Sequence, residues 1–554
     1  MTLTFDEAAA RVTAPGQIFE TGELSVRGTR YRVFVNAPPT LREVFGAARQ
    51  YGDKTFLVYQ AERWSFARVM AEADGLGAAL KDRFGVAKGD RVAIAMRNLP
   101  EWVAAFAAVI SIGAVVVPLN AWWTEEELDY ALGDCGAGVV VADRERVDRT
   151  RQSAVRLGIR TVAVRWGSDD LPEGVWRWEG VVRSGSTMPV VPISPDDDAT
   201  ILYTSGTTGH PKGAVSTHRA VVQALMAFGC AVAIEGERNP GAEPDVERSL
   251  ILVVPLFHAT GCIPVMLSCT MMGYKLVMMY RWDPAAALAL IERERVTNFV
   301  GVPTQSWDLM ESPRFSEFDT SSLRSVGGGG APAPPALVRR VAEGFKSGRP
   351  NIGYGMTETN AYGPTNSGDD YLTHPTSVGR TVPIMEVEVR DPAGQAVPAG
   401  ERGEIWLKGP NLFRGYWQMP DETAETLVDG WLRTGDIGRL DAEGFLYVED
   451  RAKDMVLRGG ENVYSAEVEA AIYEHPAVYE AAVFGVPDPR LGEEVAAIVR
   501  LKDGQTLTAT DLQAFLADHL AAYKIPSRIR FVAEALPRSA TGKILKRDLR
   551  TEQG

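Results

Sequence analysis

The segment with the clearest chemistry runs from Tyr203 to Gly213 and reads YTSGTTGHPKG. It follows an apolar pair, so we expect it to leave the end of a strand. Gly206 and Gly209 allow positive φ and a close approach of backbone N–H groups to an anion. Lys212 adds a positive charge. Hydroxyl groups surround the first glycine, on Thr204, Ser205, Thr207 and Thr208. The segment therefore predicts a phosphate-binding loop; the alternative is a Ser/Thr/Gly-rich surface turn.

This loop is not a Walker A motif, because Pro211 precedes the lysine and Gly213 follows it. Further motifs follow along the chain: a glycine run at 327–330, YGMTE at 354–358, WLRTGD at 431–436, DRAKDMVLRGGENVYSAEVE at 450–469 and PRSATGK at 537–543. In this order, and together with the phosphate loop, the last four of these make the sequence resemble the adenylate-forming (AMP-dependent synthetase and ligase) superfamily. The resemblance covers about residues 40–550 and favours the acyl-CoA synthetase, or fatty-acid–CoA ligase, branch.

The resemblance implies an ATP-dependent activation of a carboxylic acid. A carboxylate attacks the α-phosphate of ATP, so positive charge and a metal ion must offset the repulsion between two anions. Glu358 would bind Mg²⁺ together with the hydroxyl of Thr204, since hard oxygen ligands suit this ion. Thr357 would contact the α-phosphate. The plainer alternative for Thr357 and Glu358 is a helix cap.

The resemblance also assigns the nucleotide pocket. One wall beside the adenine would be formed by Gly329, Gly330 and Ala331, and the other by Gly353 and Tyr354. Asp436 would accept hydrogen bonds from both ribose hydroxyls, assisted by Arg451. A flexible glycine loop and an ordinary turn carboxylate are the structural alternatives.

The last motif places Lys543 near the C-terminus, where a lysine is usually a surface residue. By resemblance it reaches into the cleft and bridges the substrate carboxylate and the α-phosphate. It would act as a cation, because an ordinary lysine pKa of about 10.4 makes it a poor base. Lys453 would be the hinge about which the C-terminal domain swings after adenylation, unless it is a solvated linker lysine. The swing would bring Arg458, Gly459 and Gly460 towards the coenzyme A tunnel.

Two positions depart from the common family pattern. Asp450 stands where a glycine often precedes the arginine, and Ser465 stands where a proline often follows the aromatic residue. Neither departure removes a functional group.

The acid pocket would be lined by residues 257–262 and 300–304 and by the glycine run, so bulk at Gly329 should shorten the accepted acid. No Asp, Glu, Lys or Arg occurs from Leu250 to Met272. An amino acid or a dicarboxylate would need a charged partner there, so an apolar monocarboxylic acid is favoured. His258 would flank its carboxylate or gate the thiol tunnel, or else is a core histidine. A medium- or long-chain fatty acid is the first choice, and an aryl or alicyclic acid the second.

Eleven residues follow Lys543 and no carrier domain is among them, so free coenzyme A is the simplest acceptor. The alternatives are a freestanding enzyme that loads a carrier protein and a non-catalytic nucleotide sensor. A lysine acetyltransferase and a deacetylase acting on Lys543 are a further hypothesis, since acetylation would remove its charge. The oligomeric state stays open, with a homodimer as one option.

Bulk properties set limits on the partners. The chain has 554 residues, 45% hydrophobic, and a net charge of −14, which argues against nucleic acid and anionic membranes. The four cysteines, Cys135, Cys230, Cys262 and Cys269, form no CxxC pair, and the start lacks a signal-peptide pattern. The uncharged stretch 102–123 is interrupted by Gly113 and Pro118, which predicts a buried helix and then a strand. We therefore expect a cytoplasmic enzyme.

The length predicts several domains. Alternating helices and Val-rich strands over 40–190 and 200–360 predict βαβ units and parallel sheets. We expect strands at 91–95, 114–117, 138–141, 251–255, 275–279, 299–302 and 324–326. A β-rich subdomain follows residue 378, with strands at 386–390, 403–408 and 445–448. The predicted fold is thus α/β: a large N-terminal domain, 1–450, and a small mobile α+β C-terminal domain, 451–554.

Overall fold

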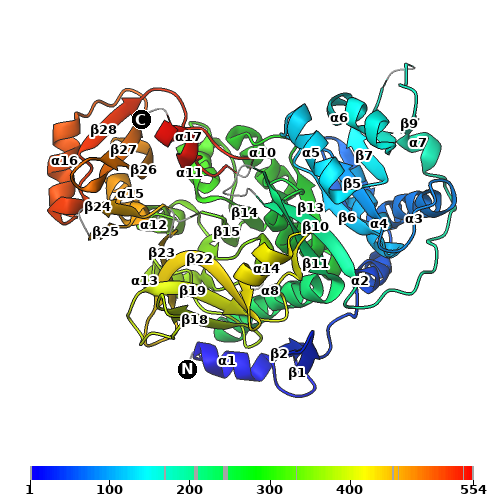
Figure 1. The fold of residues 1–554 in the computed structure, drawn as a ribbon, viewed down its shortest axis with the longest axis horizontal. Helices are drawn as coiled ribbons and strands as arrows, with labels where there is room; N and C mark the ends of the chain where they lie inside the picture. Colours follow the sequence, from blue (N-terminus) through cyan, green and yellow to red (C-terminus); the bar gives the residue numbers. More distant parts are fainter. Residues whose placement is uncertain are drawn as a thin grey trace.

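Two eight-stranded sheets form the large body of the molecule in the computed structural model, and a smaller body holds the C-terminal residues (Figure 1). The structure describes residues 3–167, 170–204, 210–240, 247–331, 333–451, 454–458, 461–540 and 542–551. The predicted α/β fold with parallel sheets and a smaller C-terminal domain is confirmed.

The first sheet has the strand order β20-β11-β10-β6-β5-β7-β8-β9. Its strands from β10 to β9 are parallel, whereas β11 pairs antiparallel with β10 and with β20. The bounds are β5 Arg91–Ala95, β6 Val115–Pro118, β7 Val139–Asp143, β8 Arg160–Val164, β9 Val175–Arg177, β10 Asp198–Thr204, β11 Lys212–Thr217 and β20 Gly415–Tyr416.

The second sheet has the order β17-β16-β15-β14-β12-β13-β3-β4, with antiparallel strands at its two edges. The bounds are β3 Thr55–Tyr59, β4 Glu62–Ser65, β12 Ser249–Leu252, β13 Lys275–Met278, β14 Asn298–Gly301, β15 Ser325–Gly329, β16 Arg349–Gly353 and β17 Thr365–Ser367. Strand β12 starts two residues before the predicted 251–255 and ends at Leu252. The proline at 255 has no N–H group to donate to a neighbouring strand, which explains why the pairing stops short of it.

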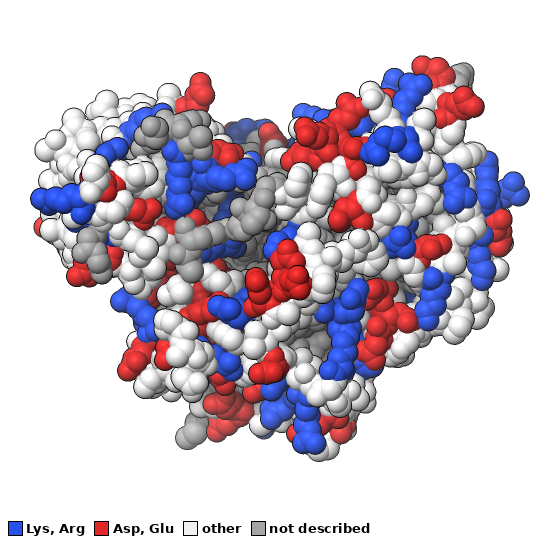
Figure 2. All heavy atoms as spheres, viewed as in Figure 1, with Lys and Arg blue, Asp and Glu red and all other residues white. Residues whose placement is uncertain are grey.

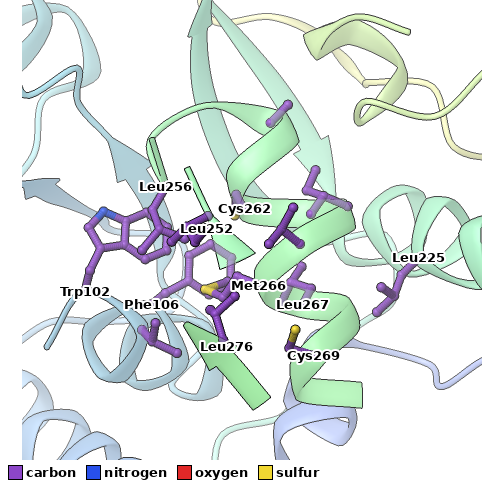
Figure 3. Close-up of a cluster of buried hydrophobic side chains, with 14 of the residues drawn as sticks. Trp102, Phe106, Leu225, Leu252, Leu256, Cys262, Met266, Leu267, Cys269 and Leu276 are labelled. Carbon is purple, nitrogen blue, oxygen red and sulfur yellow. The ribbon is translucent and has the colours of Figure 1, made fainter. Parts of the chain in front are cut away.

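A layer of helices packs between the two sheets. All twelve residues of α4 (Pro100–Ser111) are buried. Trp102 and Phe106 of α4 lie against Leu252, the last residue of β12 in the second sheet, and against Leu256 and Met266, which follow it in the chain (Figure 3). The stretch 102–123 is therefore a buried helix followed by strand β6, as the sequence predicts. Such all-round burial explains why the helix is apolar on every face.

Among the described residues, α8 (His218–Arg238) is the helix that by length and composition alone could cross a membrane. More than half of its hydrophobic window lies inside the structure, with Val221 and Leu225 in the same core as α4. A central helix of a folded domain meets the same criteria.

A third sheet and the C-terminal sheet follow. The third sheet pairs β18 (Glu386–Arg390), β19 (Gly403–Lys408), β21 (Leu427–Val428), β22 (Trp431–Leu440) and β23 (Leu446–Arg451). The C-terminal sheet pairs β24 (Val456–Arg458), β25 (Glu461–Val463), β26 (Val478–Asp488), β27 (Gly492–Leu501) and β28 (Arg528–Val532). Its helices are α15 (Ser465–Tyr473), α16 (Ala509–Ala517) and α17 (Lys546–Thr551). The chain passes from one sheet to the other after Arg451; the division at 450/451 stays a prediction.

The remaining elements cover the sheets and their edges. An N-terminal hairpin pairs β1 (Thr21–Val26) with β2 (Thr29–Phe34). The other helical elements are α1 Phe5–Val12, α2 Leu41–Ala48, η1 Arg49–Tyr51, α3 Phe66–Asp82, α5 Glu125–Cys135, α6 Arg144–Leu157, α7 Trp178–Val181, η2 Gly261–Leu267, α9 Ser268–Met272, α10 Pro284–Glu294, α11 Pro303–Glu311, η3 Phe315–Glu317, α12 Pro335–Gly344, η4 Thr357–Thr359, α13 Gly368–Thr373, α14 Pro420–Thr426 and η5 Ala522–Lys524.

Candidate active site

The predicted phosphate loop connects two neighbouring antiparallel strands. Strand β10 ends at Thr204 and β11 begins at Lys212, and these two residues are paired in register. The Thr204 hydroxyl donates to the Lys212 carbonyl at 3.4 Å. The predicted loop residues Ser205, Gly206, Thr207, Thr208 and Gly209 lie outside the described residues. The described ends are thus drawn together at the end of a buried strand, as the sequence analysis expects for such a loop.

Tyr416 connects the lysine of this loop with Glu358. Strand β20 carries Tyr416 and pairs with β11 at Ala214, while η4, which carries Thr357 and Glu358, lies against β10 and β11. The Tyr416 hydroxyl donates to Glu358 Oε1 at 2.6 Å, and Lys212 Nζ lies 5.2 Å from the centre of the Tyr416 ring. Burial, and then the neighbouring Glu358 carboxylate, raise the pKa of Tyr416, so it stays a donor. Tyr416 was not predicted as a site residue, because its only signal is this cross-strand position.

The glycine run 327–330 is mostly strand rather than loop. A Cβ on Gly327, Gly328 or Gly329 would lie within 2.0, 1.8 and 2.3 Å of carbonyl oxygens of adjacent strands, so neighbouring backbone requires these glycines. Gly330, with φ +83°, is different: a Cβ there would meet only a Val302 methyl, at 3.9 Å. That bulk at Gly329 shortens the accepted acid without abolishing ATP binding stays a prediction; the first atom added there would lie 2.3 Å from the carbonyl oxygen of Gly353, on the other predicted wall.

The two predicted adenine walls lie side by side. Gly329 at the end of β15 pairs with Gly353 at the end of the parallel strand β16. Gly330 and Ala331 continue from the first strand and Tyr354 from the second. The carboxyl ends of parallel strands are the usual place for ligand binding in open α/β sheets.

Tyr354, Asp436 and Arg451 form one polar cluster. The Tyr354 hydroxyl donates to Asp436 Oδ2 at 2.6 Å, and Arg451 Nε lies 3.4 Å from Asp436 Oδ1. The Asp436 backbone N–H donates to the hydroxyl of Thr434 at 3.1 Å. Burial, and then the Asp436 carboxylate, raise the pKa of Tyr354 far above its ordinary value. Asp436 is itself buried, so it is not an exposed turn carboxylate.

Lys543 of the small domain reaches this cluster. Burial, and secondly the nearby Arg451 charge, lower the pKa of Lys543 to about 8, whereas the Asp436 and Asp454 carboxylates act in the opposite direction. The ordinary pKa expected from the sequence is thus wrong, because the ammonium is not on the surface. It is close enough to Asp436 and Arg451 of the third sheet for both charges to act on its pKa. The ammonium is still the major form at neutral pH.

A buried carboxylate supports the loop that carries Lys543. Glu480 on β26 accepts hydrogen bonds from Arg538 and, at 3.1 Å, from the Leu536 backbone N–H. Arg538 in turn donates to the Gly542 carbonyl at 2.6 Å, one residue before Lys543. Gly542 has φ +87°, and a Cβ there would lie 3.0 Å from a Val302 methyl of the large domain. The loop is therefore held from its own domain and packed against the other.

Further polar contacts join helices α11 and α12 of the large domain to the small domain. Arg339 of α12 pairs with Glu474 at 2.9 Å, and the Tyr479 hydroxyl donates to Asp308 of α11 at 2.8 Å. The interiors of the two bodies, in contrast, are separate apolar clusters. An interface of this polar kind is typical of domains that move relative to one another.

His258 lies beside the predicted acid pocket and is neutral. Burial lowers its pKa to about 4, and its Nε2 atom has no hydrogen-bond partner among the described residues. It precedes the π-helical segment η2, in which Pro264 cannot donate and the Gly261 Cα lies close to the Pro255 carbonyl. Single π-helical turns are frequent at functional sites.

The remaining predicted residues do not join the cluster. Arg458 on β24 pairs with Glu494 at 2.9 Å within the small domain. The predicted hinge Lys453 and the predicted tunnel residues Gly459 and Gly460 lie outside the described residues. On the face shown in Figure 2, acidic and basic side chains are interspersed without a continuous basic stripe.

Comparison with known proteins identifies the family. Residues 44–417 match the AMP-binding enzyme family model, and residues 467–543 match the AMP-binding enzyme C-terminal domain. The first match alone covers more than half of the chain. The chain therefore belongs to the AMP-binding enzyme family, and it is an acid–thiol ligase of the AMP-forming acyl-CoA synthetase class.

The relatives of this chain are named for different acids. The chain is 38% identical over 493 residues to a feruloyl-CoA synthase of an Amycolatopsis species (88% of this chain, 92% of the relative). It is 33% identical over 540 residues to a long-chain-fatty-acid–CoA ligase of Bacillus subtilis strain 168 (92% and 93%). Among solved structures, an anthranilate CoA ligase in complex with anthranoyl-AMP matches with a TM-score of 0.84 at 28% identity, covering 93% of this chain and 97% of that one.

Proposed function

We propose that this ligase adenylates an apolar monocarboxylic acid with ATP, releasing pyrophosphate, and then forms the acyl-CoA thioester with release of AMP. A medium- or long-chain fatty acid is the first candidate, and an aryl or alicyclic acid the second. The observation that carries the proposal is the position of Lys543. A cation from the small domain stands beside the Tyr354–Asp436–Arg451 cluster at the carboxyl ends of the parallel strands.

In the first step, the chain's own groups offset the negative charge of two anions. Lys543 would contact the substrate carboxylate and the α-phosphate as an ammonium, while Lys212 and Thr357 contact phosphate oxygens. Asp436 would accept from the 2′- and 3′-hydroxyls of the ribose, the sugar that joins the base to the phosphates. The base would lie between the β15 and β16 ends, with the Tyr354 ring against it.

The residues present fit Mg²⁺. This ion keeps several waters and takes one or two protein oxygens plus substrate phosphates. Among the described residues, no group of three or more His, Cys, Asp or Glu side chains gathers into a protein-only metal site. Glu358 and the Thr204 hydroxyl would hold the ion, which supplies charge neutralisation when bound. Tyr416 orients Glu358 through its hydrogen bond at 2.6 Å.

The nature of the acid is argued from charge. The segment Leu250–Met272 has no Asp, Glu, Lys or Arg, and burial keeps its one histidine neutral. A substrate with a second charge would lose hydration in such a pocket without gaining a partner. A neutral His258 could still donate one hydrogen bond to the substrate carboxylate. The names of the relatives, feruloyl and long-chain fatty acyl, agree with an uncharged body but differ in its shape.

The second step would need the small domain to rotate. Lys543 occupies the cluster in the present arrangement, and Arg458 lies elsewhere on the small domain. Rotation near Lys453 would remove Lys543 and present the 458–460 face to the thiol of coenzyme A. The polar interface between the bodies supports such a motion.

The test measures AMP release with a panel of acids: octanoate, palmitate, ferulate, benzoate and cyclohexanecarboxylate, each with and without coenzyme A. We expect thiol-dependent AMP release with one class of acid, and none with succinate or with an amino acid. Pyrophosphate exchange without any thioester would instead favour loading of a carrier protein. Neither reaction with any acid would contradict the proposal and favour a nucleotide sensor.

Control by acetylation of Lys543 is a separate proposal. Lys543 is half-buried in the present arrangement, so rotation of the small domain would make it more accessible to an acetyltransferase. The modified enzyme should lose adenylation and keep thioester formation. Mass spectrometry of enzyme from cells grown with and without acid, before and after deacetylase treatment, tests this.

A further inference from the structure

The two residues that depart from the common pattern of the family are bonded to each other across the junction of the two bodies. Asp450 lies on β23 of the third sheet, and Ser465 is the first residue of α15 in the small domain. The Asp450 carboxylate accepts a hydrogen bond from the Ser465 backbone N–H and another, at 3.2 Å, from the Ser465 hydroxyl. Both side chains are buried.

The contact continues to the segment that carries Lys543. Lys546 at the start of α17 donates to the Ser465 hydroxyl at 2.7 Å and pairs with Glu469 of α15 at 2.7 Å. Lys546 follows Lys543 by three residues. The polar chain Asp450–Ser465–Lys546 therefore links the last strand of the large body to the base of the loop that delivers the ammonium.

Chemistry explains why these two residue types occur together. Glycine at 450 would offer no acceptor, and proline at 465 would offer no N–H donor. With glycine at 450 the buried Ser465 N–H would lose its acceptor, which is costly, whereas with proline at 465 the Asp450 carboxylate would keep the Arg451 N–H that donates to it at 2.8 Å. Aspartate and serine together add two hydrogen bonds between the bodies.

We propose that Asp450 is a positioning residue whose hydrogen bonds to Ser465 hold the small domain in the orientation that places Lys543 beside Asp436. The expected effect on adenylation rests on the proposed two-step function. The effect on the orientation of the small domain does not. Asp450 contacts no substrate group. It acts on the first step by raising the fraction of enzyme that is closed, and it must be released before the second.

The main variant removes both partners of the contact; of the groups bonded to Asp450, the Arg451 backbone N–H, which donates to it at 2.8 Å, also loses this acceptor. Asp450→Ala with Ser465→Pro deletes the acceptor and the N–H donor together, and proline is well accepted at the first position of a helix. We expect adenylation, measured as acid-dependent ATP–pyrophosphate exchange, to fall about tenfold or more, as for the loss of charged hydrogen bonds. Thioester formation from supplied acyl-AMP should be unchanged or faster.

Two comparison variants separate positioning from folding. Asp450→Asn keeps an acceptor for the Ser465 N–H and should recover most of the adenylation rate. Asp441→Asn is the matched control, because Asp441 lies in the same sheet and its hydrogen bonds stay within its own turn and strand, to Glu443, Phe445 and Tyr447. It should leave both half-reactions unchanged.

An orientation measurement makes the result independent of catalysis. The native cysteines are all buried, so Arg339→Cys with Glu474→Cys gives two accessible thiols at a contact between the bodies. A short bismaleimide should cross-link this pair in high yield without nucleotide, and in clearly lower yield with Asp450→Ala/Ser465→Pro added. Unchanged cross-linking, or an equal loss of both half-reactions, would overturn the proposal. Absence of ligase activity in the parent enzyme would instead contradict the proposed function and leave the cross-linking result to decide the orientation.

Discussion

The large and small domains contribute to the candidate site in different ways. In the large domain, Gly329 and Gly353 are paired on neighbouring strands of one sheet, and Tyr354 and Asp436 are bonded to each other. In the small domain, Lys543 stands on a loop held by the Glu480–Arg538–Gly542 chain and by contacts across a polar junction. The nucleotide walls belong to a packed core, whereas the cation arrives with a body that has its own core. Changes in the small domain should therefore separate the two half-reactions, and changes in the large domain should not.

The largest expected effect is that of Lys543→Ala. Loss of the cation should slow adenylation about 100-fold or more, as for loss of a preorganised charge-stabilising group. Thioester formation from supplied acyl-AMP should stay near the wild-type rate, since Lys543 would have left the site by then. The two half-reactions are measured separately. Lys524→Ala, whose lysine pairs with Glu467 in the same domain, is the control. Equal loss of both half-reactions would contradict the difference between the domains.

The second effect is a pH dependence. The buried ammonium of Lys543 has a pKa lowered to about 8, so the required cation is present below this pH and lost above it. The kcat/KM of adenylation should be level up to about pH 8 and then fall about tenfold per pH unit. Lys543→Arg, if active, should remove this fall because a guanidinium keeps its proton. A wild-type profile that is level to pH 10 would contradict the lowered pKa of Lys543, and the Lys543→Ala result would then decide its role alone.

Glu480→Gln tests the support of the loop. Glutamine has nearly the same shape but no charge, so Arg538 loses its ionic partner and holds the Gly542 carbonyl less firmly. Adenylation should slow about tenfold, while the thioester half-reaction changes little. Thermal unfolding of the variant is recorded in parallel. A lower melting temperature with both half-reactions reduced alike would assign Glu480 to folding of the small domain alone.

The smallest effect is expected for Tyr354→Phe in the large domain. It removes the hydroxyl that bonds Asp436 at 2.6 Å and keeps the ring. The KM for ATP should rise about fivefold, which corresponds to one ordinary hydrogen bond. Because the AMP group stays bound through both steps, acyl-AMP should also be held less tightly. Tyr447→Phe is the matched control, since Tyr447 bonds Asp441 away from the site. A defect confined to one half-reaction would weaken the comparison.

The fold was predictable from the sequence where local pattern decides it. Strands β5, β18 and β19 have the predicted bounds, and the uncharged stretch 102–123 divides into α4 and β6 as expected. Short strands with Val-rich or alternating patterns are recognised because their side chains alone show which faces are buried. The bounds of β12 and β15 were missed, because they depend on where a neighbouring backbone can pair.

The candidate site likewise has features that the sequence indicated and features that only the tertiary structure shows. Residue types and spacing by themselves indicated a phosphate loop, since glycines, hydroxyls and a lysine after a strand suit an anion; the acceptor at Asp436 and the cation at Lys543 came only from the resemblance that the ordered motifs carry. Only the tertiary structure decided that Tyr416 joins Lys212 to Glu358, that neighbouring carbonyls require three of the four glycines, and that burial lowers the pKa of Lys543. It also decided that Asp450 and Ser465 are partners. These properties depend on distances between segments far apart in the chain, and pairing, burial and pKa are set by neighbours in space rather than in sequence.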